Sequence, residues 1–331
     1  MLSFLLAASL QAAPYTDDLD RASLLSAIDH QLRDLQTQPA AVVALGEEQV
    51  TTAALQTTLR IFRTVVVRHH GTPQFNTEIN RRFRVLAVAD QTLFTAYYVP
   101  SMQASRTKSG PYLYPFYAYP TGGCPLTRGE IDGGALAGKG LELAWVRDPF
   151  ARYSLMIEGS GLLTFEDGSV KHLNYAGNNG HPYKGVEQMF QDWHRSTGNP
   201  LNWASITRYF TPRLESFWPY QARNPRYIFF RLGDEGPFGL SRIPLTAGRS
   251  IATDKRLYPA GGLAFIDVPG TGIRRFVVDQ DKGAAITGKH HVDLFVGGGE
   301  QGKGLGTHLL HQGRLHYLLA RPEVPAPTES P

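Results

Sequence analysis

Three aspartates in the C-terminal third of the chain are the residues best suited to do chemistry. Asp254 follows the strand-like stretch RSIAT (249–253), and Asp281 and Asp293 each lie at a predicted junction of strand and loop. One loop aspartate taken alone is usually a turn former or a helix cap. Three of them among glycines, which let a ligand approach the backbone, are less easily explained in that way.

Neighbouring motifs do not support a nucleotide, a metal or a serine nucleophile. GGGEQGKG (297–304) nearly matches a phosphate-binding P-loop, but Gly304 stands where Ser or Thr must ligate Mg²⁺. His290 and His291 are neighbours in a predicted strand and point to opposite faces, so they cannot easily share one ion. EGSG (158–161) lacks the pattern of a nucleophile elbow. A carboxylate site without metal or cofactor remains.

The composition predicts a mainly β protein of two domains. The chain has 331 residues, of which 42% are hydrophobic and 19% charged, and this length exceeds that at which single cores usually divide. Its 34 glycines and 22 prolines favour short strands and tight turns. The single cysteine, Cys124, excludes an internal disulfide and any multi-cysteine metal site. The net charge of +4 is scattered, without a nucleic-acid-binding signature, so no nucleic acid partner is expected.

Elements can be placed from periodicity. Helical spacing predicts amphipathic helices within 16–36 and 47–70, and a short third one within 73–83. Strands and turns follow from Val85, with a β-meander over 141–177 that turns at Asp167-Gly168. Five short strands after residue 240, joined by glycine-rich loops, predict a barrel. The Pro-rich tail, 321–331, is predicted to be disordered.

The first 15 residues, MLSFLLAASLQAAPY, resemble the end of a secretory signal peptide, although a basic n-region is missing. The rival interpretation is a mis-annotated start or a frayed terminus. No apolar run approaches the roughly 18 residues of a membrane span. We expect an exported protein without an integral membrane span.

Eight motifs together are more specific than any one of them. In order along the chain they are FTAYYVPSMQASRTKSGPYLYPFYAYP, LTRGEI, ELAWVRDP, IEGSG, YAGNNGHPY, NPRYIFFR, IPLTAGRSIATD and DKGAAITGKHHVDLFVGGG. This series resembles the membrane-bound lytic murein transglycosylase A family, which has a C-terminal three-aspartate (3D) domain. The likeness runs from about residue 85 to residue 318.

The resemblance implies a discontinuous double-psi β-barrel domain, residues 16–104 and 239–320, of which 239–320 contains the 3D motif. It implies a second β-barrel domain inserted at 105–238, with a groove for a glycan between the two. The implied activity is cleavage of the β-1,4 bond between N-acetylmuramic acid and N-acetylglucosamine in peptidoglycan, leaving a 1,6-anhydromuramoyl end.

The resemblance assigns the three motif aspartates to Asp254, Asp281 and Asp293, with Asp293 as acid and base. One carboxyl suffices because the nucleophile is the sugar's own C6 hydroxyl. Such an acid needs a raised pKa, which burial or a neighbouring negative charge provides. Asp281 is either that neighbour or a loop-holding residue that accepts backbone hydrogen bonds.

The residues expected to bind the glycan share positions in motifs on the two walls of the groove. They are Thr95, Tyr97, Tyr98, Glu158, Gly159, Ser160, Gly161, Tyr175, Asn179 and His181. Aromatic side chains pack their faces on sugar rings, and side-chain hydroxyls form hydrogen bonds with the sugar.

Departures from the family pattern affect activity and localisation. Lys282, Ala284 and Glu158 replace the usual Thr, Gly and Gln, and a cation beside Asp281 would lower a nearby acid's pKa. A lipobox cysteine is missing, so a soluble periplasmic protein is expected and outer-membrane association is disfavoured.

The sequence therefore predicts a peptidoglycan lytic transglycosylase. Its expected partners are glycan strands, with cell-wall remodelling proteins as a further class. Two alternatives stay open, a non-catalytic glycan-binding relative and a glycan hydrolase on the same barrel.

Overall fold

The computed structural model describes residues 15–283, 286–306 and 308–322. The predicted signal peptide, most of the tail and Ala284 therefore lie outside the described residues. The chain forms two compact units. Of the described residues, the first unit contains those up to Tyr98, those between Phe238 and Gly297 and those from Gly304 on. The second unit contains Val99–Pro237 and Gly298–Lys303.

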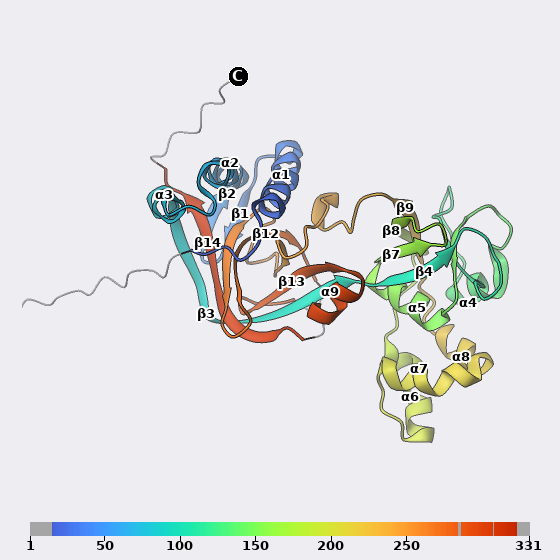
Figure 1. Cartoon of the computed structure of the whole chain (residues 1–331). Coiled ribbons are helices and arrows are strands. Elements are labelled where there is room, and N and C mark those ends of the chain that lie inside the picture. The colour runs from blue at the N-terminus through green and yellow to red at the C-terminus, as the bar shows by residue number, and fades with distance from the viewer. Residues whose placement is uncertain (1–14, 284–285, 307, 323–331) are drawn as a thin grey trace, which may run out of the picture. The chain divides into compact units, whose positions relative to one another are not determined.

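The first unit is a closed six-stranded barrel with helices at its N-terminus (Figure 1). The strand order is β10-β12-β11-β14-β3-β13. Its strands are β3 (Phe83–Val99), β10 (Ser250–Ala252), β11 (Leu263–Val268), β12 (Ile273–Asp281), β13 (His291–Gly298) and β14 (Leu310–Ala320). Strand β10 pairs in parallel with β12 and antiparallel with β13. The remaining elements are α1 (Arg21–Thr37), β1 (Val42–Leu45), β2 (Glu48–Thr51), α2 (Thr52–His69), α3 (Gln74–Arg82) and the turn η3 (Leu240–Arg242). Helix α9 (Gly299–Gly306) is divided between the units, because the residues up to Lys303 belong to the second unit and those from Gly304 on to the first.

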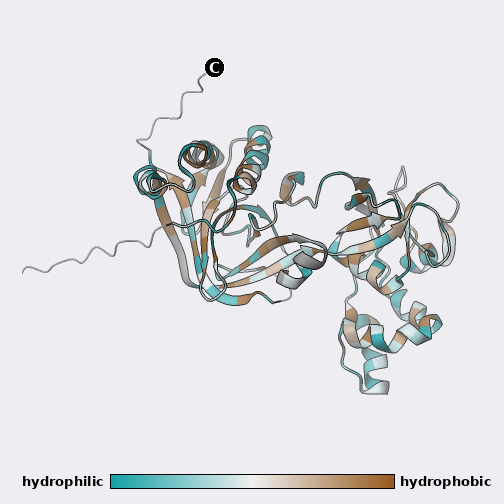
Figure 2. Cartoon of the chain, in the orientation of Figure 1, coloured by the Kyte–Doolittle hydropathy of each residue, from teal (hydrophilic) through white to brown (hydrophobic). Residues whose placement is uncertain are grey.

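The N-terminal helices form because apolar residues recur at helical spacing behind good caps. Asp20 caps α1 by accepting a hydrogen bond from the backbone N of Ser23 at 2.8 Å, and Thr51 caps α2 through the N of Ala54 at 3.1 Å. Figure 2 shows hydrophobic and hydrophilic residues along α1 and α2, as amphipathic helices require. Phe62 of α2 reaches the barrel strand residue Phe276, with ring centroids 4.8 Å apart. The helices thus share one core with the barrel.

The helix predicted within 47–70 is confirmed as α2, whereas the prediction of an uninterrupted β-meander over 141–177 was wrong. The segment 47–70 is not helical from its start, because Gly46, at φ 63°, turns β1 into the hairpin partner β2. The β-meander over 141–177 is interrupted by helix α5 (Pro149–Glu158). Asp148 caps that helix and Pro149 occupies its first turn, a local signal that outweighs the flanking strand pattern.

A buried ion pair fixes the N-terminal segment to the barrel. Both terminal nitrogens of Arg249 donate to the two carboxylate oxygens of Asp17 at 2.8 Å, and both side chains are buried. Arg249 also donates to the main-chain oxygens of Phe276 and Asp20, at 2.8 and 2.9 Å. All groups of the pair are thereby compensated within the protein.

We predict that Arg249→Met lowers the free energy of unfolding by about 3–5 kcal/mol, because it leaves the Asp17 carboxylate buried without its partner. Arg63→Met is the matched control. Its partner is Asp29 at 2.6 Å, and both side chains are more than 40% exposed, so the loss should stay below about 1 kcal/mol. Denaturant unfolding followed by circular dichroism measures both; equal losses would contradict the prediction.

The second unit is built on a six-stranded sheet of order β5-β6-β4-β7-β8-β9. The strands are β4 (Ser101–Ser105), β5 (Tyr114–Tyr117), β6 (Glu142–Val146), β7 (Ser160–Phe165), β8 (Val170–Asn178) and β9 (Ile228–Gly233). A parallel bridge from Ala118 to Phe230 connects its two edges, which makes it barrel-like. The hairpin of β7 and β8 turns at Gly168, φ 79°, as predicted.

Helices complete the second unit around a separate aromatic core. They are α4 (Arg128–Glu130), the π-helical turn η1 (Ile131–Ala135), α5, α6 (Val186–Thr197), α7 (Trp203–Phe210), the turn η2 (Thr211–Arg213) and α8 (Leu214–Gln221). Phe190 of α6 stacks on Tyr220 of α8, with centroids 5.2 Å apart. The predicted fold class, mainly β with N-terminal helices and two barrel domains, is confirmed. Within the described residues, no helix is long and apolar enough to cross a membrane.

Candidate active site

Strand register brings two of the three predicted aspartates to the same region of the barrel. Ala252 of β10 is the register partner of Asp281 on β12 and also of Asp293 on β13. The two aspartates are therefore separated by two strand spacings, about 10 Å between their backbones. Residues paired in register project to the same side of a sheet, so both carboxyl groups can face one ligand.

Asp293 is a half-buried carboxyl group with one strong hydrogen bond. The Thr95 hydroxyl donates to its Oδ1 at 2.7 Å. Burial raises the pKa of Asp293 above its ordinary value, whereas the Thr95 hydrogen bond and the nearby His291 oppose that rise. The elevation comes mainly from burial and does not depend on a charge at Asp281. A raised pKa is what a general acid near neutral pH needs.

Thr95 connects Asp293 to a histidine. Its Oγ1 lies 3.1 Å from Nε2 of His291 and 2.7 Å from Oδ1 of Asp293. A hydroxyl has one proton and can accept at the same time. Thr95 therefore donates to Asp293 and can accept from His291 in the tautomer that carries its proton on Nε2.

Both oxygens of Asp281 already have partners. Tyr97 donates its hydroxyl proton to Oδ2 at 2.7 Å, and the backbone N of Lys282 donates to Oδ1 at 2.8 Å. Burial raises the pKa of Asp281 above its ordinary value, and these two hydrogen bonds only partly oppose that rise. Of the two roles left open by the sequence, these contacts match the loop-holding one.

Asp254 is set apart from this pair by a strong cationic partner. Arg256 donates to its carboxylate from Nη2 at 2.5 Å, and the backbone N of Gly288 donates at 2.8 Å. The Arg256 guanidinium and the backbone donors hold the pKa of Asp254 well below its usual range. Asp254 is thus an ionised anchor for the loop that contains Gly288.

The sequence analysis missed a buried carboxylate next to the site. Asp279 is fully buried and pairs with Lys255; Thr253 and Tyr317 donate to it at 2.6 and 2.7 Å. Lys255 also lowers the pKa of Asp281 through its charge. The signal was the spacing in DQD (279–281), which a strand with a bulge places around one site.

Tyr97 and Tyr98 follow Thr95 on β3. The ring of Tyr97 lies 5.3 Å from that of Phe295, and its hydroxyl is used by Asp281. Tyr98 packs against Gly306, where an added Cβ would come within 2.7 Å of the ring.

The predicted second-unit residues surround the junction of α5 and β7. Glu158 is the last residue of α5, and Gly159 ends it in the left-handed region at φ 78°. Ser160 and Gly161 begin β7. Gly161 is required by packing, since an added Cβ would lie 2.2 Å from Leu155.

The three remaining predicted residues differ in accessibility. Tyr175 of β8 is 45% exposed. Asn179 is buried and bonds three backbone groups, those of Leu126, Pro225 and Tyr227. The ring of His181 lies 2.8 Å from the main-chain oxygen of Pro125. Asn179 thereby stabilises its loop in this structure.

The Lys282 side chain is exposed, and Lys282 is not among the groups that shift the pKa of Asp293. The structure therefore does not support the expectation that Lys282 lowers the pKa of the acid. Among the described residues, no group of three His, Cys, Asp or Glu side chains could hold a metal ion.

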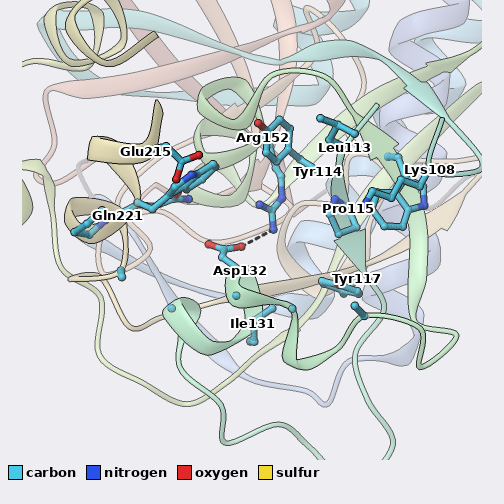
Figure 3. A pocket seen from close by; sticks show the side chains of 18 residues that line it. Lys108, Leu113, Tyr114, Pro115, Tyr117, Ile131, Asp132, Arg152, Glu215 and Gln221 are labelled. Atoms are coloured by element: carbon cyan, nitrogen blue, oxygen red, sulfur yellow. Dashed lines mark hydrogen bonds and ion pairs between the residues drawn. The ribbon is translucent and has the colours of Figure 1, made fainter. Parts of the chain in front are cut away.

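The second unit also contains a cavity of about 620 Å³ (Figure 3). The ion pair of Asp132 and Arg152, at 2.8 Å, lies within it, with Glu215 and Gln221 to one side and Lys108 to the other. Its positive and negative side chains are balanced in number, two of each.

Comparison with known proteins identifies both units. Residues 125–231 match the MltA specific insert domain, and residues 249–319 match the 3D domain. The chain is 32% identical over 244 residues to the membrane-bound lytic murein transglycosylase A of Escherichia coli K12; the match covers 69% of this chain and 66% of that relative.

Solved structures agree with the fold. The E. coli MltA with bound chitohexaose has a TM-score of 0.69 at 24% identity, covering 94% of this chain and 96% of that one. The lytic transglycosylase LtgG of Burkholderia pseudomallei has a TM-score of 0.56 at 27% identity, covering 94% and 96%. The chain thus belongs to the membrane-bound lytic murein transglycosylase A family with a 3D domain.

Proposed function

We propose that this protein is a lytic transglycosylase that cleaves peptidoglycan glycan strands, with Asp293 as its acid and base. The observation that carries the proposal is the half-buried Asp293 carboxyl, whose pKa is raised by burial and whose Oδ1 is held by Thr95. The relatives' names supply the reaction class, and the chitohexaose bound to E. coli MltA supports a glycan ligand.

In the proposed reaction, protonated Asp293 donates its proton to the glycosidic oxygen as the bond from that oxygen to the anomeric carbon breaks. The C6 hydroxyl of the same sugar forms the new bond to the anomeric carbon, and its proton passes to Asp293. The acid is restored without water, and the product ends in a 1,6-anhydro ring.

The proposed supporting residues act around this carboxyl. Thr95 orients Asp293, Tyr97 and Asp281 hold β3 against the loop after β12, and Asp254 holds the loop that contains Gly288. Tyr98 is proposed to contact sugar. Export to the periplasm is part of the proposed function.

A hydrolase is disfavoured because Asp281, the nearest second carboxylate in register, already uses both oxygens on Tyr97 and the Lys282 backbone. Hydrolysis needs a carboxylate that activates water or attacks the sugar. The deciding experiment is digestion of purified sacculi followed by mass spectrometry of the soluble products. Anhydromuropeptides support the proposal; reducing ends, or binding without release, would refute it.

A further inference from the structure

A second cavity in the second unit is lined by two arginines and by no acidic residue. Its volume is about 320 Å³. Arg128 and Arg226 line it together with the rings of Tyr175 and Tyr183 and the side chain of Ile157. In the larger cavity of Figure 3, by contrast, Asp132 and Glu215 offset Lys108 and Arg152. The smaller cavity therefore has an excess of positive charge.

Arg128 is a buried cation without a carboxylate partner. It is 1% exposed and donates to Sδ of Met156 at 3.2 Å and to the main-chain oxygen of Arg226 at 2.6 Å. Its guanidinium lies 4.7 Å from the ring centre of Tyr153. Its Nε is buried and has no hydrogen-bond partner in the part of the chain that the structure describes. Burial lowers the pKa of Arg128, the mark of an undercompensated charge.

The nearest acid cannot compensate this charge fully because it serves another arginine. Asp132 is paired with Arg152 at 2.8 Å, and both of those side chains are largely buried. Two buried arginines thus share one carboxylate. Burying an unpaired charge is costly, so an entering anion would be stabilised here.

Arg226 is the more accessible of the two arginines that line the cavity. It is partly exposed, and its guanidinium donates only to the main-chain oxygen of His181, at 3.5 Å, among the described residues. Arginine binds carboxylates with two parallel hydrogen bonds. Around it, Ile157, Tyr175 and Tyr183 are 43%, 45% and 50% exposed. Such walls suit small aliphatic side chains and an amide plane.

We propose that this cavity binds the terminal carboxylate of a short peptide, with Arg226 as the direct contact and Arg128 as a second, buried cation in the lining. Peptidoglycan carries peptides with free carboxylates, so the identity of the natural ligand rests on the proposed function. The affinity of the cavity for a peptide carboxylate does not rest on that function. Gly159 and Tyr175 then belong to a peptide site.

The test measures binding of N-acetyl-alanyl-alanine and of its C-terminal amide to the full chain by calorimetry. We expect the acid to bind at least about 10-fold more tightly than the amide, since one charge-assisted pair is lost. Arg226→Gln should weaken the binding of the peptide acid by about the same factor. Arg195→Gln, an exposed arginine outside the cavity, removes the same charge and should have no effect.

Two results would overturn the proposal. Equal binding of acid and amide, or unchanged binding in Arg226→Gln, would mean that the arginines recognise no carboxylate. Acetate or inorganic phosphate binding as tightly as the peptide would mean that the apolar walls contribute nothing. If the protein binds the peptide acid selectively but releases no product from sacculi, only the proposed function is refuted.

Discussion

Replacing Asp293 by Asn is expected to lower the release of anhydromuropeptides from sacculi by about 10²-fold or more. Asn has nearly the same shape and can still accept a hydrogen bond from Thr95, but it cannot donate a proton to the glycosidic oxygen. The measurement is the initial rate of soluble product, quantified by mass spectrometry. Asp254→Asn is a useful comparison, because an ionised anchor paired with Arg256 has no proton to give.

The loss must be separated from unfolding. The pKa of Asp293 is raised in the folded state, so its ionised form is disfavoured there and stability falls as pH rises through the unfolded and then the folded pKa. Removing the charge should therefore leave the melting temperature at neutral pH unchanged or higher. Activity in Asp293→Asn close to that of the wild type would refute the assignment of the acid.

Thr95→Val should lower kcat/KM by about 10-fold or more and move the basic limb of its pH profile to higher pH. The sign follows from the hydrogen bond, which lowers the pKa of Asp293. Without it the carboxyl stays protonated to higher pH, and activity that needs the proton is lost later as pH rises. The lower rate arises because the carboxyl loses its orientation and its link to His291.

Matched variants distinguish orientation from packing. Thr95→Ser keeps the hydroxyl and should restore both the rate and the position of the limb. The groups around Asp293 that could also titrate are His291 on its own strand, Tyr97 on β3 and Asp281 on β12. His291→Gln, which removes only the titratable ring, tests the contribution of that charge. A basic limb that does not move in Thr95→Val would refute the predicted coupling.

The sequence by itself determined the fold class, the N-terminal helices and the identity of the acid candidate. Helical spacing of leucines, the Asp167-Gly168 turn and the ordered motifs are local patterns. Such patterns can be recognised in the sequence without knowing which segments pack against each other. It failed where one local signal competed with another, as at Asp148-Pro149, which starts a helix inside an apparent run of strands.

The tertiary structure decided what each aspartate can do. Asp254, Asp281 and Asp293 look alike in the sequence, but the carboxyl proposed as the acid differs from the Asp254 anchor in its burial and in partners that come from distant segments. Thr95 lies 198 positions from Asp293, and Tyr97 lies 184 positions from Asp281. Only barrel closure places them in contact, and for the same reason the unbalanced charge of Arg128 became visible only in the folded second unit.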